Sequence, residues 1–180
     1  NRADATVANG RGAGIFPIWM SSFTEFLKAE AAITLGTTGN VNTLVESGIR
    51  KSFAKVFGFA TAVGVPVPEA FAPSQDTQDD YVDIVNNSLN AATTTDAKLN
   101  IVMKEYYLAA FGNGIETFNN YRRTGKPSNM QPMLDASNAG SFIRSFFYPA
   151  AVANLNPNVS QKTTTTVKVF WDNNPDNFIN

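Results

Sequence analysis

The chain has 180 residues, of which 43% are hydrophobic and 16% are charged, and its formal net charge is −1. This length and composition are typical of a globular protein with a sizeable core, and the balanced charge gives little support for binding to a nucleic acid backbone. Cysteine and histidine are absent, which excludes disulfides, zinc sites built from these residues, and catalysis by a thiol or an imidazole within these residues.

The first predicted helix follows a glycine-rich stretch over residues 1–14, which we interpret as a loop. Pro17 suits the first turn of a helix. From Trp19 onward, apolar residues recur at helical spacing on one face. We therefore expect a helix over about residues 18–35 that ends at Gly36.

The second helix carries the most regular apolar stripe in the chain, from Val41 to Phe57. Gly48 and Ser52 lie on this stripe, and small residues at such positions allow a neighbouring helix to approach closely. A short turn over residues 36–40 separates the first two helices. Together they are predicted to form a helical hairpin.

A connector with three prolines, over residues 64–75, precedes the third helix. Asp76, Asp79 and Asp80 lie at its start, where acidic side chains suit the positive end of the helix dipole. These carboxylates also suit calcium, but the glycine and terminal glutamate of a calcium loop are missing. We therefore favour a role in helix initiation, with the helix continuing to Leu89.

The fourth helix is expected to begin at a threonine cap within residues 93–95. Gly112 and Gly114 break it, and a further short helix then runs to Gly125. The predicted core-facing stripe of the fourth helix consists of Leu99, Val102, Met103, Tyr106, Tyr107, Ala110 and Phe111.

The sequence therefore predicts an all-α fold with two parts. Residues 1–125 form tetratricopeptide-like helical hairpins, and residues 126–180 form a long, mostly irregular segment that packs on them. Within this segment, residues 163–171 are rich in threonine and valine, which favours a short strand. We expect a single domain that is a piece of a longer chain.

Two adjacent arginines, Arg122 and Arg123, close the last predicted helix, followed by Gly125 and Pro127. Cations suit a helix C-terminus, and glycine followed by proline is a typical stop signal. The forked donors of these arginines also suit a carboxylate or sulfate ligand. We favour the structural interpretation, in which they tie the helix end to acidic or carbonyl groups of the following segment.

Four blocks of this chain, in this order, resemble the C-terminal part of the SusD/RagB family of nutrient-binding outer-membrane lipoproteins. Five departures from the family pattern, at Phe118, Asn120, Lys126, Val152 and Phe170, indicate a divergent branch. The matching positions are Glu25, Ala29, Glu30 and Ala31; Glu116, Asn119, Arg122, Arg123, Thr124, Gly125 and Pro127; Arg144, Tyr148, Pro149 and Asn156; and Lys168, Val169, Trp171 and Asp172.

The resemblance implies non-catalytic capture of a nutrient glycan or peptide at the cell surface and its delivery to a SusC-like TonB-dependent transporter. It implies no cofactor and no metal. It also implies a lipid anchor on an N-terminal cysteine, in an N-terminal half of the protein that lies outside these residues and packs against them. The residues with an implied structural role are Glu25, Glu30, Glu116, Arg122, Arg123, Gly125, Arg144, Tyr148 and Trp171.

Trp19 is the one ligand-binding candidate, because an exposed indole face can stack on a sugar ring, although we favour packing against Phe23. A tetratricopeptide-type adaptor for a protein partner is one alternative function, which the long irregular segment disfavours. A surface glycoside hydrolase is another. Glu25 and Glu30 lie five residues apart, on different faces of a helix, and so do not form the paired carboxylates that such an enzyme needs.

Overall fold

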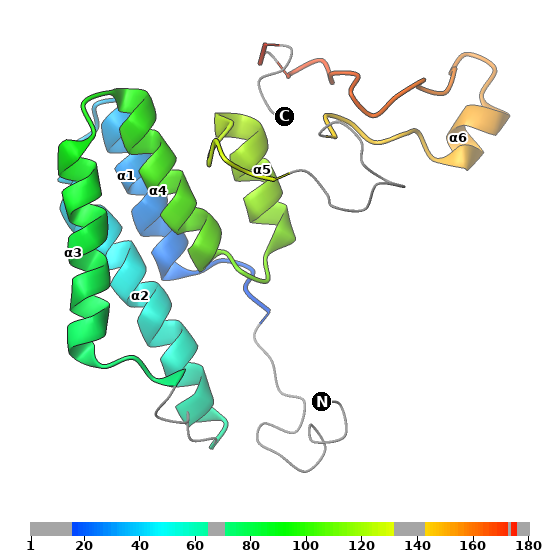
Figure 1. Ribbon diagram of the computed structural model, residues 1–180. Helices are drawn as coiled ribbons and strands as arrows, with labels where there is room; N and C mark the ends of the chain where they lie inside the picture. Colours follow the sequence, from blue (N-terminus) through cyan, green and yellow to red (C-terminus); the bar gives the residue numbers. More distant parts are fainter. Residues whose placement is uncertain (1–15, 65–70, 132–142, 173, 176–180) are drawn as a thin grey trace. The chain divides into compact units, whose positions relative to one another are not determined.

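The computed structural model of the chain describes residues 16–64, 71–131, 143–172 and 174–175. Within these ranges all regular secondary structure is helical (Figure 1), which confirms the predicted all-α class. The chain divides into a helical unit, residues 1–120, and a C-terminal unit, residues 121–180. The helices are α1 (Ser21–Thr34), α2 (Val41–Ala62), α3 (Gln75–Ala91), α4 (Thr95–Ala109), α5 (Gly114–Thr124) and α6 (Ala150–Leu155).

In the helical unit, α1 to α4 follow one another up and down as two helical hairpins (Figure 1). α1 packs against α2 and α4, and α2 also packs against α3 and α4. The rings of Phe23 and Phe26 from α1 meet the ring of Tyr106 from α4, at centroid distances of 5.2 and 5.7 Å. The fully buried core around them also includes Ala29, Val45, Val82, Leu89, Val102, Met103 and Ala110.

Gly48 sets how closely α1 and α2 pack. A Cβ atom at this position would lie 2.8 Å from Cζ of Phe26, closer than real Cβ atoms come to a neighbour. Only a glycine therefore leaves room for the Phe26 ring. The prediction that a small residue on the α2 stripe permits a close helix approach is confirmed.

Of α1 to α4, three helices (α2, α3 and α4) begin at a residue whose side-chain oxygen accepts a hydrogen bond from the amide three residues later, which satisfies an otherwise unpaired donor. These caps are Asn40, Ser74 and Thr94, at distances of 3.1, 3.2 and 3.1 Å. Thr94 lies within the predicted range of threonines. At α3 the cap is Ser74, and Asp76 lies in the first turn that follows.

The predicted start of the first helix is wrong by about one turn, because α1 begins at Ser21 and Pro17 lies before it. The buried side chain of Asn113 donates to the carbonyl oxygens of Pro17 and Ile18, at 2.9 and 3.2 Å. These carbonyls are thereby engaged outside the helix. The predicted end is confirmed, since Gly36 follows the cap at Leu35 with a φ of 66°.

The predicted stripe of the fourth helix is wrong at two positions. Tyr106 is fully buried, but its neighbour Tyr107 is exposed, and Phe111 is 92% exposed. α4 ends at Ala109, so Phe111 no longer follows the helical repeat that places every third or fourth residue on one face.

In the C-terminal unit, the predicted strand at residues 163–171 is absent from the structure, which has only bends and turns there. The amides of Arg144 and Ser145 both donate to the carbonyl of Thr165, at 2.9 and 3.0 Å. A ladder needs bonds that alternate along both strands, whereas these two converge on one oxygen. The short helix α6 lies in the segment that was expected to be mostly irregular.

Candidate functional site

The candidate ligand-binding residue Trp19 lies just before α1, where two segments distant in the sequence meet. Residues 16–19 are joined to the turn between α4 and α5 by the two hydrogen bonds from the Asn113 side chain. A Cβ atom on Gly112 would lie 3.6 Å from Cδ of Pro17, which also places the two segments in contact. We call the exposed apolar side chains of these segments the Trp19 surface: Phe16, Ile18, Trp19, Phe111 and Ile115.

Asn113 holds both sides of this junction. Its side-chain oxygen accepts from the amide of Glu116 at 2.9 Å, which caps the start of α5, while its side-chain nitrogen binds the two carbonyls before α1. One buried side chain therefore positions Trp19 relative to the first turn of α5.

The indole of Trp19 is fixed but accessible. Its Nε1 donates to the hydroxyl of Thr24 at 3.1 Å, and its ring meets the Phe23 ring edge-on, with centroids 5.8 Å apart and an interplanar angle of 85°. The side chain nevertheless remains 53% exposed. Trp19 therefore packs on Phe23 and also presents aromatic surface to solvent, so the packing and binding interpretations are compatible.

The other members of the Trp19 surface were not identified from the sequence. Phe111 was assigned to the core, and Ile115 was assigned only to a helix. The available signal was the pair of glycines at 112 and 114, which ends α4 and releases both neighbouring side chains from the buried stripe.

Glu25, one of the residues with an implied structural role, links α1 to α2. Its carboxylate accepts from Lys51 of α2 at 2.6 Å and from Lys28 at 3.4 Å. The hydrogen bond from Lys51 is the main reason that the pKa of Glu25 lies below its ordinary value, in spite of the opposing effect of burial. Glu30 is buried in α1, and Glu116 is half-buried in the first turn of α5.

The C-terminal unit is organised around Arg144. Its guanidinium group binds both carboxylate oxygens of Asp172 and also donates to the backbone carbonyls of Asn174 and Pro175, at 3.1 and 3.0 Å. The hydrogen bonds from Arg144 are the largest cause of the lowered pKa of Asp172. Nearby, the hydroxyl of Ser145 donates to the carbonyl of Val167.

The end of α5 contacts the same C-terminal stretch. The guanidinium group of Arg122 lies 4.2 Å from the centroid of the Trp171 ring, and the Arg122 carbonyl accepts from the Asn174 side chain at 2.9 Å. Arg123 is exposed. Gly125 ends the helix as predicted, with a φ of 65° and an amide that donates to the carbonyl of Tyr121.

Tyr148 is held by a glutamine side chain. Gln161 accepts from the Tyr148 amide at 2.9 Å and donates to its carbonyl at 2.8 Å, and Lys162 lies 4.9 Å from the centre of the tyrosine ring. The structure therefore brings Arg122, Arg144 and Trp171 into one network around residues 171–175 and places Tyr148 in a separate pairing with Gln161.

Among the described residues, no group of three acidic side chains is arranged to hold a metal ion. Asp79, one of the aspartates considered for calcium, accepts from Arg50 at 2.6 Å and from Gln75 at 3.0 Å. In the same described ranges, no helix is both long enough and apolar enough to cross a membrane.

Comparison with known proteins identifies the family. The sequence model of the SusD-like family, described as SusD and RagB outer membrane lipoproteins, matches residues 14–174. A solved structure titled "Bacteroidetes AC2a SusD-like" has the same fold, with a TM-score of 0.57 and 20% sequence identity over 75% of this chain and 25% of that chain. This chain thus spans about a quarter of the length of that solved structure. The search of curated proteins found no match to this chain. Because the family match extends over most of its length, the chain belongs to the SusD-like family of outer membrane lipoproteins.

Proposed function

We propose that this chain is part of a non-catalytic binding protein that captures a nutrient glycan at the cell surface and passes it to a SusC-like TonB-dependent transporter. The observation that carries this proposal is the family match over residues 14–174. Members of the family are binding lipoproteins that generally associate with such transporters. We further propose that the protein is anchored by a lipid on an N-terminal cysteine outside the 180 residues, and that an N-terminal part of the protein packs against them.

The Trp19 surface is our candidate for contact with the glycan. A tryptophan ring suits the apolar face of a sugar, and its fixed position lowers the entropy lost on binding. Trp19 is held at both its ring nitrogen and its ring edge, yet half of its surface is open. Phe16 and Phe111, which are exposed aromatic side chains of the same two segments, are further candidates for stacking on a sugar.

We assign a scaffolding role to the other residues of the family motifs. Glu25 joins two helices through Lys51, and Arg144 gathers the residues near the C-terminus around its guanidinium group. Both side chains are buried and occupied by protein partners, so they are not available to a ligand. Arg122, stacked on Trp171, is placed with them.

The proposal is tested by affinity electrophoresis of the chain through gels that contain a panel of plant, microbial and host polysaccharides. We expect at least one glycan to retard the wild-type protein, and Trp19→Ala to lose most of that retardation. Trp171→Ala is the matched control, because it removes the other tryptophan of the chain and should leave binding unchanged. Equal retardation of wild type and Trp19→Ala would assign the glycan to another surface.

Two further outcomes are informative. Retention of the chain by immobilised peptides, with no glycan bound, would replace a glycan by a peptide as the nutrient. Hydrolysis of any retarding glycan, measured as released reducing ends, would contradict the non-catalytic role. Delivery is tested separately by cross-linking in outer membranes, where the protein should be recovered with a TonB-dependent transporter.

A further inference from the structure

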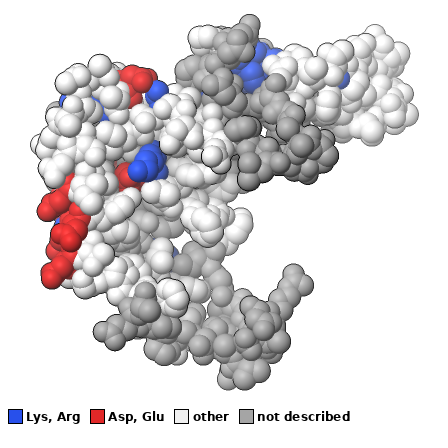
Figure 2. Space-filling view, viewed as in Figure 1, with Lys and Arg blue, Asp and Glu red and all other residues white. Residues whose placement is uncertain are grey.

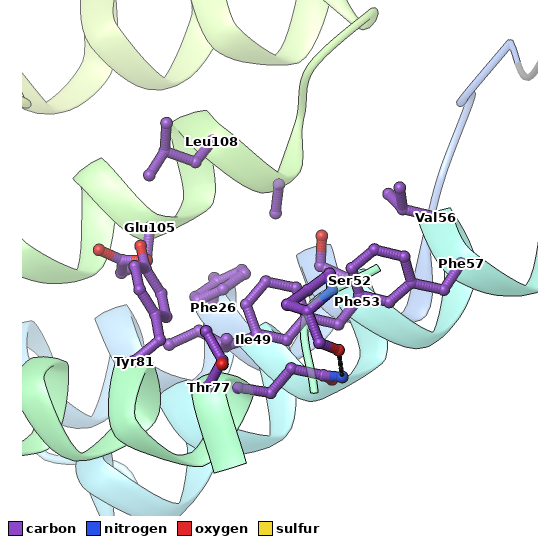
Figure 3. Close-up of a pocket in the computed structure, with 13 residues that line it drawn as sticks. Phe26, Ile49, Ser52, Phe53, Val56, Phe57, Thr77, Tyr81, Glu105 and Leu108 are labelled. Atoms are coloured by element: carbon purple, nitrogen blue, oxygen red, sulfur yellow. Dashed lines mark hydrogen bonds between the residues drawn. The ribbon is translucent and has the colours of Figure 1, made fainter. Parts of the chain in front are cut away.

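A second candidate binding site lies inside the helical unit, in a pocket formed mainly by α2, α3 and α4 (Figure 3). Its volume is about 470 Å³, within the range of about 300–1,000 Å³ that is typical of small-molecule sites. Most of its wall is apolar, and the principal apolar side chains are Phe26, Ile49, Phe53, Val56, Phe57 and Leu108.

One end of this pocket is polar. Figure 3 shows Glu105 and Tyr81 together at this end, with Val56 and Phe57 at the opposite end. The Tyr81 hydroxyl donates to Oε2 of Glu105 at 2.7 Å. Among the described residues no other side chain donates to this carboxylate, so Oε1 retains its capacity to accept a hydrogen bond.

Glu105 is only 4% exposed, so its carboxylate lies largely out of water. An ionised carboxylate in such a place is costly unless charged or polar donors surround it. Burial is the main cause of the raised pKa of Glu105, which the hydrogen bond from Tyr81 only partly offsets. A cationic donor that entered the pocket would relieve this cost.

The walls of the pocket suit an apolar body attached to such a cation. The Phe53 ring lies 5.8 Å from the Tyr81 ring and 6.0 Å from the Phe57 ring, centroid to centroid. A ring-sized hydrocarbon can pack against these faces, and an ammonium group is further attracted by them. A sugar does not suit this site, because an apolar wall leaves most of its hydroxyl groups without partners.

The surface next to the pocket has the sign of charge that attracts a cation. α3, which contributes Tyr81, carries four aspartates and neither lysine nor arginine. Figure 2 shows acidic atoms gathered along the edge that α3 occupies in Figure 1. Arg50 of α2 offsets part of this charge through its ion pair with Asp79. A local excess of negative charge raises the rate at which cations arrive.

We propose that the pocket between α2, α3 and α4 binds a small primary amine with an apolar, ring-sized body, whose ammonium group pairs with Glu105 and whose body packs on Phe53 and its neighbours. This site is distinct from the Trp19 surface, and it does not depend on the glycan-binding role proposed above. The chemistry recognised here is a single positive charge on a hydrophobic molecule.

The test uses 2-phenylethylamine as the probe and 2-phenylethanol as its neutral counterpart of similar size. Each is titrated into the chain near neutral pH, and the methyl signals of Ile49, Leu108 and Ala109, which line the pocket, are followed by carbon-13 NMR. We expect both probes to shift these signals and the amine to bind about tenfold more tightly, the usual gain from a charge-assisted hydrogen bond. Equal affinities for the two probes, or no shift with the amine, would overturn the proposal.

Two variants assign the effect to the pocket. Glu105→Gln keeps an acceptor for the Tyr81 hydroxyl but removes the charge, so the preference for the amine should disappear. Asp83→Asn removes an exposed carboxylate of α3 and should retain it. If Glu105→Gln does not fold, the comparison of the two probes in the wild-type protein still decides the outcome. Persistence of the tenfold preference in folded Glu105→Gln would contradict the role assigned to this carboxylate.

Discussion

Arg144 and Asp172, 28 residues apart in the sequence, form a bidentate ion pair in which Nε and Nη2 of Arg144 donate to Oδ2 and Oδ1 of Asp172 at 2.8 and 2.7 Å. Their side chains are only 7% and 2% exposed. A planar guanidinium group matches the two oxygens of a carboxylate, which a lysine cannot do. This pair joins the two ends of the described stretch 143–172 within the C-terminal unit.

Removing Arg144 should destabilise the C-terminal unit strongly, because it leaves Asp172 buried without its cation. We expect Arg144→Ala to lower the free energy of unfolding by about 3–5 kcal/mol. Arg144→Lys should also be destabilising, since a lysine cannot make the bidentate pair of hydrogen bonds with Asp172. Protease cleavage within residues 143–175, followed by mass spectrometry, locates the effect. The exposed Asn154 of α6, changed to alanine, is the control and should leave the cleavage rate unchanged.

The same pair should make stability depend on acidity. The pKa of Asp172 in the folded state lies below its ordinary value of 3.8, chiefly because of the hydrogen bonds from Arg144. The unfolded state therefore binds a proton more readily, and the stabilisation is complete above 3.8 and is lost as the pH falls through the folded-state pKa. Denaturant unfolding at a series of acidic pH values should show this loss in the wild type. Asp172→Asn should be less stable than the wild type near neutral pH. Its free energy of unfolding should also lack the part of the pH dependence that the Asp172 carboxyl contributes.

The contribution of Glu105 to folding stability should change with pH in the opposite direction to that of Asp172. Burial raises its pKa in the folded state above the ordinary 4.5, so the folded state binds the proton more tightly than the unfolded state. Stability is therefore lost as the pH rises from 4.5 through the folded-state pKa. Glu105→Gln removes this loss, and its stability relative to the wild type should increase over that window. A stability difference that is independent of pH would show that the carboxyl does not titrate in this way.

Gly48→Ala should separate the effect of packing from that of helix propensity. Its new Cβ would meet the Phe26 ring at 2.8–3.0 Å, so we expect a loss of about 1–3 kcal/mol. Gly58→Ala, in the same helix and with nothing within 4 Å, should instead stabilise the protein by about 0.5–1 kcal/mol. Thermal unfolding measures both changes, and two changes of the same sign would contradict the close packing of α1 on α2.

Asn113→Ala should loosen the Trp19 surface from both sides. It removes the cap of α5 and the two hydrogen bonds to the carbonyls of Pro17 and Ile18. We expect a cost of about 1–3 kcal/mol and faster hydrogen exchange at the amide of Glu116. The fluorescence of Trp19 should become more sensitive to a soluble quencher when it is measured in a Trp171→Phe background. Asn119→Ala, which changes an exposed residue of α5, is the control and should leave the exchange rate of the Glu116 amide unchanged.

Much of the helical unit follows from local sequence rules. The all-α class, the helix ends at Gly36 and Gly125 and a threonine cap within residues 93–95 were all predicted. Each depends on residues within a few positions of one another, and on backbone preferences that act at that range. The close approach at Gly48 was also predicted, since a small residue on a regular apolar stripe allows a neighbouring helix to pack closely against it.

The candidate sites were predicted less well. Trp19 was identified, but its surroundings were not, because the neighbouring segment lies more than 90 residues later and is brought there by Asn113. Glu105 gave no signal that it would be buried beside Tyr81, since charged residues on a helix usually face water. The expected strand at residues 163–171 did not form. Its composition favours a strand, but the backbone amides of Arg144 and Ser145 both donate to the carbonyl of Thr165 instead of bonding alternately along a partner strand.

The sequence by itself determined the helical class, several helix ends, many of the apolar positions on the helices and the family motifs that the chain carries, because these properties arise from neighbouring residues. The tertiary structure alone decided that Trp19 remains open, that Glu105 is enclosed and that Arg144 finds Asp172. Such outcomes depend on which distant side chains meet, and pairing across 24 to 96 residues is set by the packing of whole helices and loops rather than by any local preference.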